Sequence, residues 1–349
     1  MPSQSPVLSI IPLGRPPWPT LDPFLFCVHH VDHYPAGDLG MGPPPEQLRG
    51  RRIGMDFDGR DGWNMYHGER VPGFPRHPHR GFETITIARR GFIDHADSMG
   101  ATARFGAGDV QWMTAGGGVA HSEMFPLVNT VGPNPAELFQ IWLNLPAADK
   151  MRPAYFTMLW NERIPTLKLR DAGGHAVEVR LIAGALPGLV ALKPPPSSWA
   201  ARPESSVRVL TIRLDPGARW VVPGSTAGVN RMLYFVAGDR ARLAAPTDAT
   251  RASSLGPGQA AQLHAEADVL IEGGAIGTDL LLLEGRPIGE PVVQHGPFVM
   301  NSRDEIMRAF QDYQSTGFGG WPWREDGPVH PRTAARFAVH ADGRREEAG

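Results

Sequence analysis

Two short stretches of the sequence place histidine and glutamate side chains at intervals that suit metal binding. The first, HPHRGFE, contains His77, His79 and Glu83, and the second, HSE, contains His121 and Glu123. Side chains alternate along a strand, so residues two apart project from one face, about 6.6 Å from each other. Two imidazole rings can converge from that separation onto one ion at roughly 2.0–2.1 Å. The spacing permits a metal site, although one such pair is also common on the polar surface of an ordinary strand.

The second pair makes a metal site the better interpretation. The two pairs lie about forty residues apart in the sequence, and antiparallel strands of one barrel could bring them together. Imidazole and carboxylate ligands suit Fe, Mn, Co, Ni or Zn, and four protein ligands leave up to two positions of an octahedral ion open. Iron is preferred, because the set contains two histidines and a carboxylate plus one further histidine. Glu83 would share the face of His77, His79, Ile85 and Ile87, so spacing alone leaves its role open.

The elements that must position these side chains are short strands. The chain of 349 residues contains 41 glycines and 35 prolines, and β-type runs such as FETITIA, VQWMT and LFQIWLNL alternate with turn signals from about residue 82 onward. A second β-rich series follows, including VRVLTIRL, RMLYFVAGD and DLLLLEG. This pattern predicts an all-β protein with two β domains in tandem.

Three other segments carry local signals. A helix is predicted at about 302–315, because Ser302 and Glu305 form a capping box and Gly317 can end the helix. Residues 1–75 are broken by proline and glycine, so we expect little regular structure there and an insertion at about 35–70. The polar tail at about 325–349 is expected to be mobile.

Composition excludes several classes of protein. The net charge is -2 and the cations are scattered, which argues against direct binding of nucleic acid. Cys27 is the one cysteine, so neither an internal disulfide nor a cysteine-based zinc cluster can form. We find no secretory signal and no apolar run long enough to span a bilayer. The expectation is a cytoplasmic protein, and a monomer.

Four stretches of the sequence resemble the signatures of a known family. FPRHPHRGFETIT, GDVQWMTAGGGVAHSEMF, LFQIWLNLPAADKM and GEPVVQHGPFVMNSRDEI match, in order, signatures of the pirin family within the cupin superfamily. The resemblance implies a bicupin, in which two jelly-roll β-barrels occur in tandem and the N-terminal barrel holds one metal, usually Fe²⁺. It implies His77, His79, His121 and Glu123 as the ligands and gives Glu83 a supporting role.

The resemblance also implies a division of the chain and a function. We expect a metal-binding cupin domain at 1–165, a cupin domain without metal ligands at 166–290, and an extension with the helix and polar tail at 291–349. The implied activity is a quercetinase-like dioxygenase acting on an aromatic, flavonol-type substrate, with Glu123 or Glu83 accepting a proton. The alternatives are a metal- and redox-sensing regulator that binds a protein partner, and a structural cupin that keeps its metal without turnover.

Several histidines have no partner at strand spacing. We interpret them as ordinary surface or hydrogen-bonded side chains. They are His29, His30, His33, His67 and His95.

Overall fold

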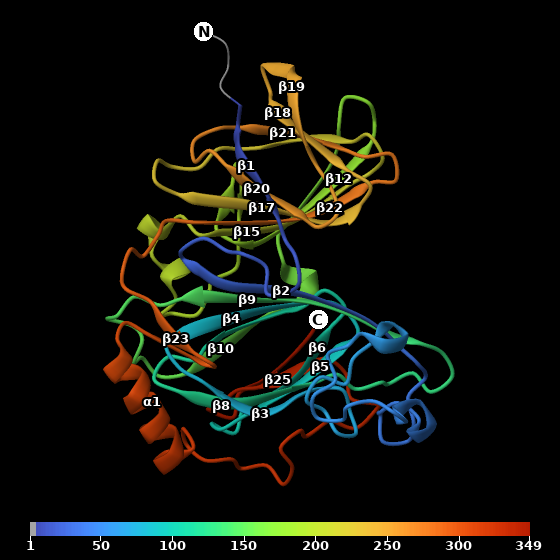
Figure 1. Cartoon of the computed structure of the whole chain (residues 1–349), viewed down its shortest axis with the longest axis vertical. Helices are drawn as coiled ribbons and strands as arrows, with labels where there is room; N and C mark the ends of the chain where they lie inside the picture. Colours follow the sequence, from blue (N-terminus) through green and yellow to red (C-terminus); the bar gives the residue numbers. More distant parts are fainter. Residues whose placement is uncertain (1–4) are drawn as a thin grey trace. The chain divides into compact units, whose positions relative to one another are not determined.

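The chain folds into strands arranged in two compact units, each built from two segments of the sequence (Figure 1). The computed structural model describes residues 5–349. Unit 1 contains the segment that ends at Cys27 together with Arg163–Gly289, and unit 2 contains Val28–Glu162 together with Glu290–Gly349. The prediction of an all-β protein with two tandem barrels and one short helix is confirmed. No helix within the described residues is long and apolar enough to cross a membrane.

Unit 2 is built on two antiparallel sheets. One has the order β10-β7-β4-β9-β2 and the other the order β26-β25-β6-β5-β8-β3. The strands are β2 (Phe24–Tyr34), β3 (Gly73–His79), β4 (Phe82–Arg90), β5 (Phe92–Asp97), β6 (Thr102–Gly106), β7 (Val110–Thr114), β8 (Val119–Met124), β9 (Asn134–Asn144), β10 (Tyr155–Leu159), β25 (Phe337–Val339) and β26 (Arg345–Glu347). Phe105, Met113 and Phe156 belong to the apolar core of this unit. Strands β3 and β8 pair with each other at one end of the second sheet.

Unit 1 has its own pair of larger sheets and its own apolar core. Their orders are β1-β20-β17-β22-β15-β12-β11 and β16-β21-β18-β19. The strands are β1 (Val7–Pro12), β11 (Thr166–Arg170), β12 (Ala176–Ala183), β15 (Arg208–Leu214), β16 (Arg219–Val222), β17 (Asn230–Gly238), β18 (Ala241–Ala245), β19 (Asp248–Leu255), β20 (Gln259–Leu263), β21 (Val269–Gly273) and β22 (Thr278–Gly285). Leu210, Leu233 and Leu282 are among the buried side chains that fill the space between the strands.

The units divide the chain differently from the expected domains at 1–165, 166–290 and 291–349. Strand β1 lies in unit 1 because it pairs antiparallel with β20, about 250 residues further along the chain. The expectation of little regular structure before residue 75 was wrong here, and also at the eleven-residue strand β2. Between these strands and β3, the insertion contains only the short 3₁₀ turns η1 (Pro45–Leu48) and η2 (Arg60–Gly62) as helical structure.

The C-terminal segment is part of unit 2 and supplies two strands and the helix. Helix α1 (Arg303–Thr316) is capped by Ser302, whose hydroxyl accepts a hydrogen bond from the Glu305 amide, and it ends at Gly317 with a φ of 57°, as predicted. The tail, expected to be mobile, instead extends the second sheet, because β25 pairs with β6. Burial of Phe337 on β25 stabilises this pairing.

Candidate metal centre

Three of the predicted ligands lie together on the neighbouring strands β3 and β8. The antiparallel register places His77 directly opposite His121, and His79 follows two residues later on the same face. One nitrogen from each of these imidazoles lies within 4.8 Å of the others, which is close enough for all three to bind one ion. His79 and His121 are buried and His77 is partly exposed, so the group sits just inside the surface of the barrel.

The ring nitrogens of the group have few partners within the protein. His77 Nδ1 lies 2.8 Å from the Pro75 carbonyl, so its Nε2 can carry the lone pair for a metal. Both ring nitrogens of His121 are buried without a hydrogen-bond partner among the described residues. Because unpaired buried nitrogens are costly, an ion that binds one nitrogen of each ring fits the donor set.

Burial also prepares the imidazoles for metal binding. It lowers the pKa of His77 to about 4 and holds the pKa values of His79 and His121 well below 6.5. The cationic form loses more hydration than the neutral form on burial, which is the cause of these shifts. All three rings are therefore neutral at pH 7, the state in which a histidine ligates a metal.

Glu123 lies on the same strand as His121, beside the three histidines. Its Oε2 is 3.9 Å from His121 Nε2 and accepts a hydrogen bond of 3.0 Å from Gln140 Nε2. Its Oε1 accepts a hydrogen bond of 3.2 Å from the Thr86 hydroxyl. Burial raises the pKa of this carboxyl group. Hydrogen bonds to both carboxylate oxygens thus hold Glu123, the fourth predicted ligand, next to the histidine group.

Glu83 occupies a different place from the one its spacing suggested. Strand β3 ends at His79, and a turn with a φ of 86° at Gly81 separates it from β4. Glu83 accepts a hydrogen bond of 2.5 Å from Thr114, its cross-strand neighbour, whereas Thr86 on the same strand reaches Glu123. Since residues three apart on a strand face opposite ways, Glu83 projects away from the face that carries Thr86. The expectation of one continuous face from His77 to Ile87 was wrong.

The turn after His79 is held tightly by distant parts of unit 2. Lys150 Nζ donates hydrogen bonds to the Gly81 carbonyl at 2.7 Å and to the Val299 carbonyl at 3.1 Å. Arg80 forms an ion pair with Asp312 of helix α1 at 2.7 Å. These contacts fix the backbone immediately after His79, so the C-terminal segment helps to orient this histidine.

Sequence reasoning missed one histidine that lies next to the group. His95 was interpreted as an ordinary side chain, but it is fully buried and lies directly opposite Glu123 in the β5–β8 pairing. Its Nε2 is 3.3 Å from Asp97 Oδ2. The spacing could have revealed it, because His95 and Asp97 repeat the two-residue interval of His121 and Glu123.

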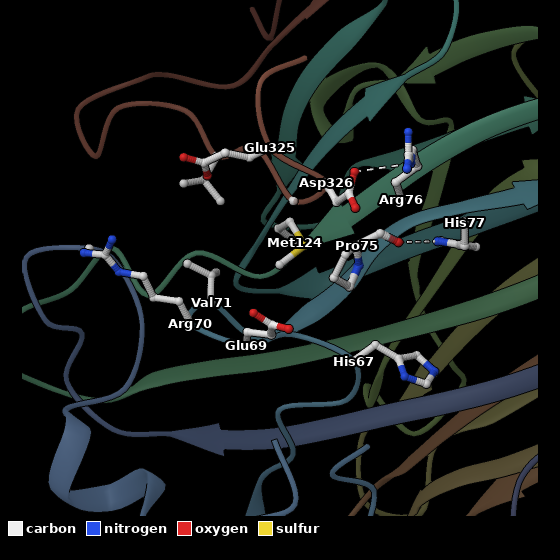
Figure 2. Close-up of a pocket in the computed structure, with 13 residues that line it drawn as sticks. His67, Glu69, Arg70, Val71, Pro75, Arg76, His77, Met124, Glu325 and Asp326 are labelled. Carbon is white, nitrogen blue, oxygen red and sulfur yellow. Dashed lines mark hydrogen bonds and ion pairs between the residues drawn. The ribbon is translucent and has the colours of Figure 1, made fainter. Parts of the chain in front are cut away.

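A pocket of about 560 Å³ adjoins the group at His77 (Figure 2). Its size falls within the range of roughly 300–1,000 Å³ for small-molecule sites. Figure 2 shows His77 beside Pro75 at one edge of the pocket, with Arg70 and Glu325 at the opposite side. The lining is rich in charged side chains and includes His67, Glu69, Arg70, Arg76, Glu325 and Asp326. The insertion and the C-terminal segment therefore both contribute to the surroundings of His77.

Comparisons with known proteins match two parts of this chain to one family. The Pirin family model matches residues 53–143, and the model of the Pirin C-terminal cupin domain matches residues 209–319. A pirin-like protein of Caulobacter vibrioides is 35% identical, over 80% of this chain and 91% of its own. Human pirin is 33% identical, over 74% of this chain and 81% of its own.

The chain belongs to the pirin family. A crystal structure of a quercetin 2,3-dioxygenase from Acinetobacter baumannii superposes with a TM-score of 0.68 at 26% identity, covering 91% of this chain and 99% of that one. The residues matched by the Pirin family model, 53–143, include the four predicted ligands, His77, His79, His121 and Glu123.

Proposed function

We propose that this pirin-family chain is a metal-dependent dioxygenase that binds one Fe²⁺ through His77, His79, His121 and Glu123 and acts on an aromatic, flavonol-type substrate. The observation that carries the proposal is the group of three histidines within reach of one ion, of which His79 and His121 are buried with ring nitrogens that lack a hydrogen-bond partner among the described residues. The likeness to a quercetin 2,3-dioxygenase supports the choice of substrate. Mn, Co, Ni and Zn suit the same ligands, so metal content is part of the test.

The bound ion would supply Lewis-acid activation of a substrate hydroxyl and redox chemistry towards dioxygen. The protein side chains then bind and orient the substrate and accept its proton. The pocket beside His77 is the proposed place for the aromatic ring. Glu123 is the proposed proton acceptor, because hydrogen bonds from Thr86 and Gln140 hold its carboxylate in position beside the histidine group. Glu83 has a supporting role, which its hydrogen bond with Thr114 fits.

Two experiments test the proposal. The first measures metal content by elemental analysis, where His79→Ala and Glu123→Ala should each lose most of the metal while circular dichroism shows the fold intact. Stoichiometric metal in both variants would reject the ligand assignment.

The second experiment measures oxygen uptake by the anaerobically iron-loaded protein with quercetin. Uptake that is absent from His79→Ala supports a dioxygenase. No uptake, together with no rise in melting temperature on adding quercetin, would favour the alternative of a metal-sensing regulator that binds a protein partner.

A further inference from the structure

Two buried polar side chains near Glu123 remain unexplained after the metal is taken into account. Gln111 is 1% exposed, and neither its Oε1 nor its Nε2 has a hydrogen-bond partner among the described residues. His95 is 0% exposed, and its Nδ1 also lacks a partner there. Neither residue belongs to the histidine group, so an ion bound by that group would satisfy neither of them.

Both side chains face the interior of the barrel beside Glu123. Gln111 and Gln140 lie on either side of Thr86 in the five-stranded sheet, so the three side chains form one row on one face. Thr86 and Gln140 both donate hydrogen bonds to Glu123, which shows that this row faces the carboxylate. From the other sheet, His95 is the direct cross-strand neighbour of Glu123. We call Thr86, Gln111, Gln140, His95 and Glu123 the polar layer.

The polar layer contains more hydrogen-bond donors and acceptors than the surrounding protein atoms can pair. The Gln111 amide offers two N–H donors and a carbonyl oxygen, and His95 offers one further ring nitrogen. Unpaired buried groups of this kind are rare in folded proteins, and ordered water with two to four polar partners is their usual complement. Each Glu123 oxygen accepts one hydrogen bond from the protein, which leaves further lone pairs available.

We propose that ordered water occupies the polar layer, bound by Gln111 and His95 and donating to Glu123. Water there completes the hydrogen bonding of the buried amide and the ring nitrogen. It also donates a hydrogen bond that helps to fix the Glu123 carboxylate. Gln111 and His95 are then positioning residues for Glu123, acting on the carboxylate through water.

The sign of a stability change tests the proposal in metal-free protein. Gln111→Met keeps the length of the side chain and removes its hydrogen-bonding atoms. If water fills the layer, the variant leaves that water and Glu123 short of a partner, and the melting temperature falls by several degrees. If the layer is dry, the variant removes an unsatisfied amide and the melting temperature rises, which would overturn the proposal. Gln140→Met is the matched control, because it removes the hydrogen bond from Gln140 to Glu123 and should lower the melting temperature whether or not the layer holds water.

A measurement on the unaltered protein keeps the proposal testable if Gln111→Met fails to fold. A high-resolution crystal structure of the unaltered protein should show water within hydrogen-bonding distance of the Gln111 amide and His95 Nδ1. An empty layer there would overturn the proposal.

The positioning role has its own readout in the Co²⁺-loaded protein. Gln111→Met should change its visible absorption spectrum and weaken Co²⁺ binding about tenfold in competition with a chelator. An unchanged spectrum and affinity would reject the positioning role. None of these measurements uses quercetin or dioxygen, so their failure is distinguishable from a failure of the proposed dioxygenase activity.

Discussion

Replacing Lys150 should loosen the turn that follows His79. The ammonium group is buried and donates hydrogen bonds to three acceptors, the carbonyls of Gly81 and Val299 and the side-chain oxygen of Asn144. Lys150→Met keeps most of the side-chain volume and removes all three donors. The variant therefore removes the charged donor from the Gly81 and Val299 carbonyls and leaves Asn144 Oδ1 with the Leu145 amide, and Gly81 lies two residues from the proposed ligand His79.

The structure sets the size of the effect. Hydrogen bonds from a charged donor contribute about 1.5–3 kcal/mol each, so three of them stabilise by roughly 4.5–9 kcal/mol. Burial opposes this, because it lowers the pKa of Lys150 from 10.5 to about 8, a cost of about 3.4 kcal/mol for the charged form. We take about 3 kcal/mol as the net loss in unfolding free energy, near the middle of the difference between these terms, which runs from about 1 to about 6 kcal/mol. For a unit of this size that corresponds to a fall of about 6–12 °C in melting temperature.

Differential scanning calorimetry and chelator competition check the prediction together. Lys150→Met should lower the melting temperature of unit 2 and weaken metal binding about tenfold, since the backbone beside His79 is freed. Lys168→Met is the matched control, because the Lys168 side chain lies in unit 1, is 73% exposed and forms a surface ion pair with Glu178. A melting temperature for Lys150→Met within 2 °C of the parent protein would refute the reasoning.

Three further predictions follow from other contacts. Asp312→Asn breaks the ion pair between Arg80 and the half-exposed Asp312, so the free energy of unfolding should fall by under about 1 kcal/mol and metal binding should weaken a few-fold in chelator competition. The control Asp304→Asn should leave metal binding unchanged. Burial lowers the pKa of Lys150 from its ordinary value of 10.5 to about 8, so the unfolded state binds more protons between these pH values, and urea titrations should show stability rising with pH from 8 to 10.5. Glu284→Gln leaves the buried guanidinium of Arg231 without its carboxylate, so unit 1 should lose about 3–5 kcal/mol in denaturant titrations, with metal content unchanged.

Side-chain alternation predicted which side chains of the histidine group share a face. His77 and His79 are two apart on a short strand, and His121 lies on the strand that pairs with it. The two-residue interval therefore gave the shared face directly, and local capping signals gave helix α1. The shared face of His77 and His79 and the ends of helix α1 depend on neighbours within a few residues, which is why the sequence alone could predict them. The pairing that brings His121 to this face joins segments about forty residues apart.

The features that could not be predicted depend on pairing between distant segments. Glu83 was placed on the wrong face because Gly81 turns the chain close to Val299, and a Cβ there would lie 2.0 Å from the Val299 carbonyl. His95 was overlooked because its importance depends on the register of β5 against β8. Strand β1 was missed because its partner is β20. The approach of Gly81 to Val299 and the pairing of β1 with β20 leave no periodic signal in the sequence nearby, whereas the two-residue interval of His95 and Asp97 is present but does not identify its partner on β8.

The two units together show which parts of the fold a metal centre requires. Strands β3-β8-β5-β6 of unit 2 and β16-β21-β18-β19 of unit 1 follow the same order, so the β16–β21 pair corresponds to the pair that carries the histidines. In unit 1 that pair places Trp220 opposite Ile271 and Val222 opposite Val269, and all four side chains belong to the apolar core. No second group of metal-binding side chains occurs within residues 5–349.

The ends of the corresponding inner strands differ in the same way. Unit 2 pairs Phe82 with Asn144 at this position, next to His79, whereas unit 1 pairs Arg231 with Glu284. The Arg231 guanidinium also donates to loop carbonyls, including that of Ala267 at 2.7 Å, so a buried ion pair ties the loops across this end of the barrel. The same strand order thus has two outcomes. In unit 2 the paired strands carry polar side chains that suit a metal centre, whereas in unit 1 the corresponding strands carry apolar core side chains and an ion pair joins the neighbouring inner strands.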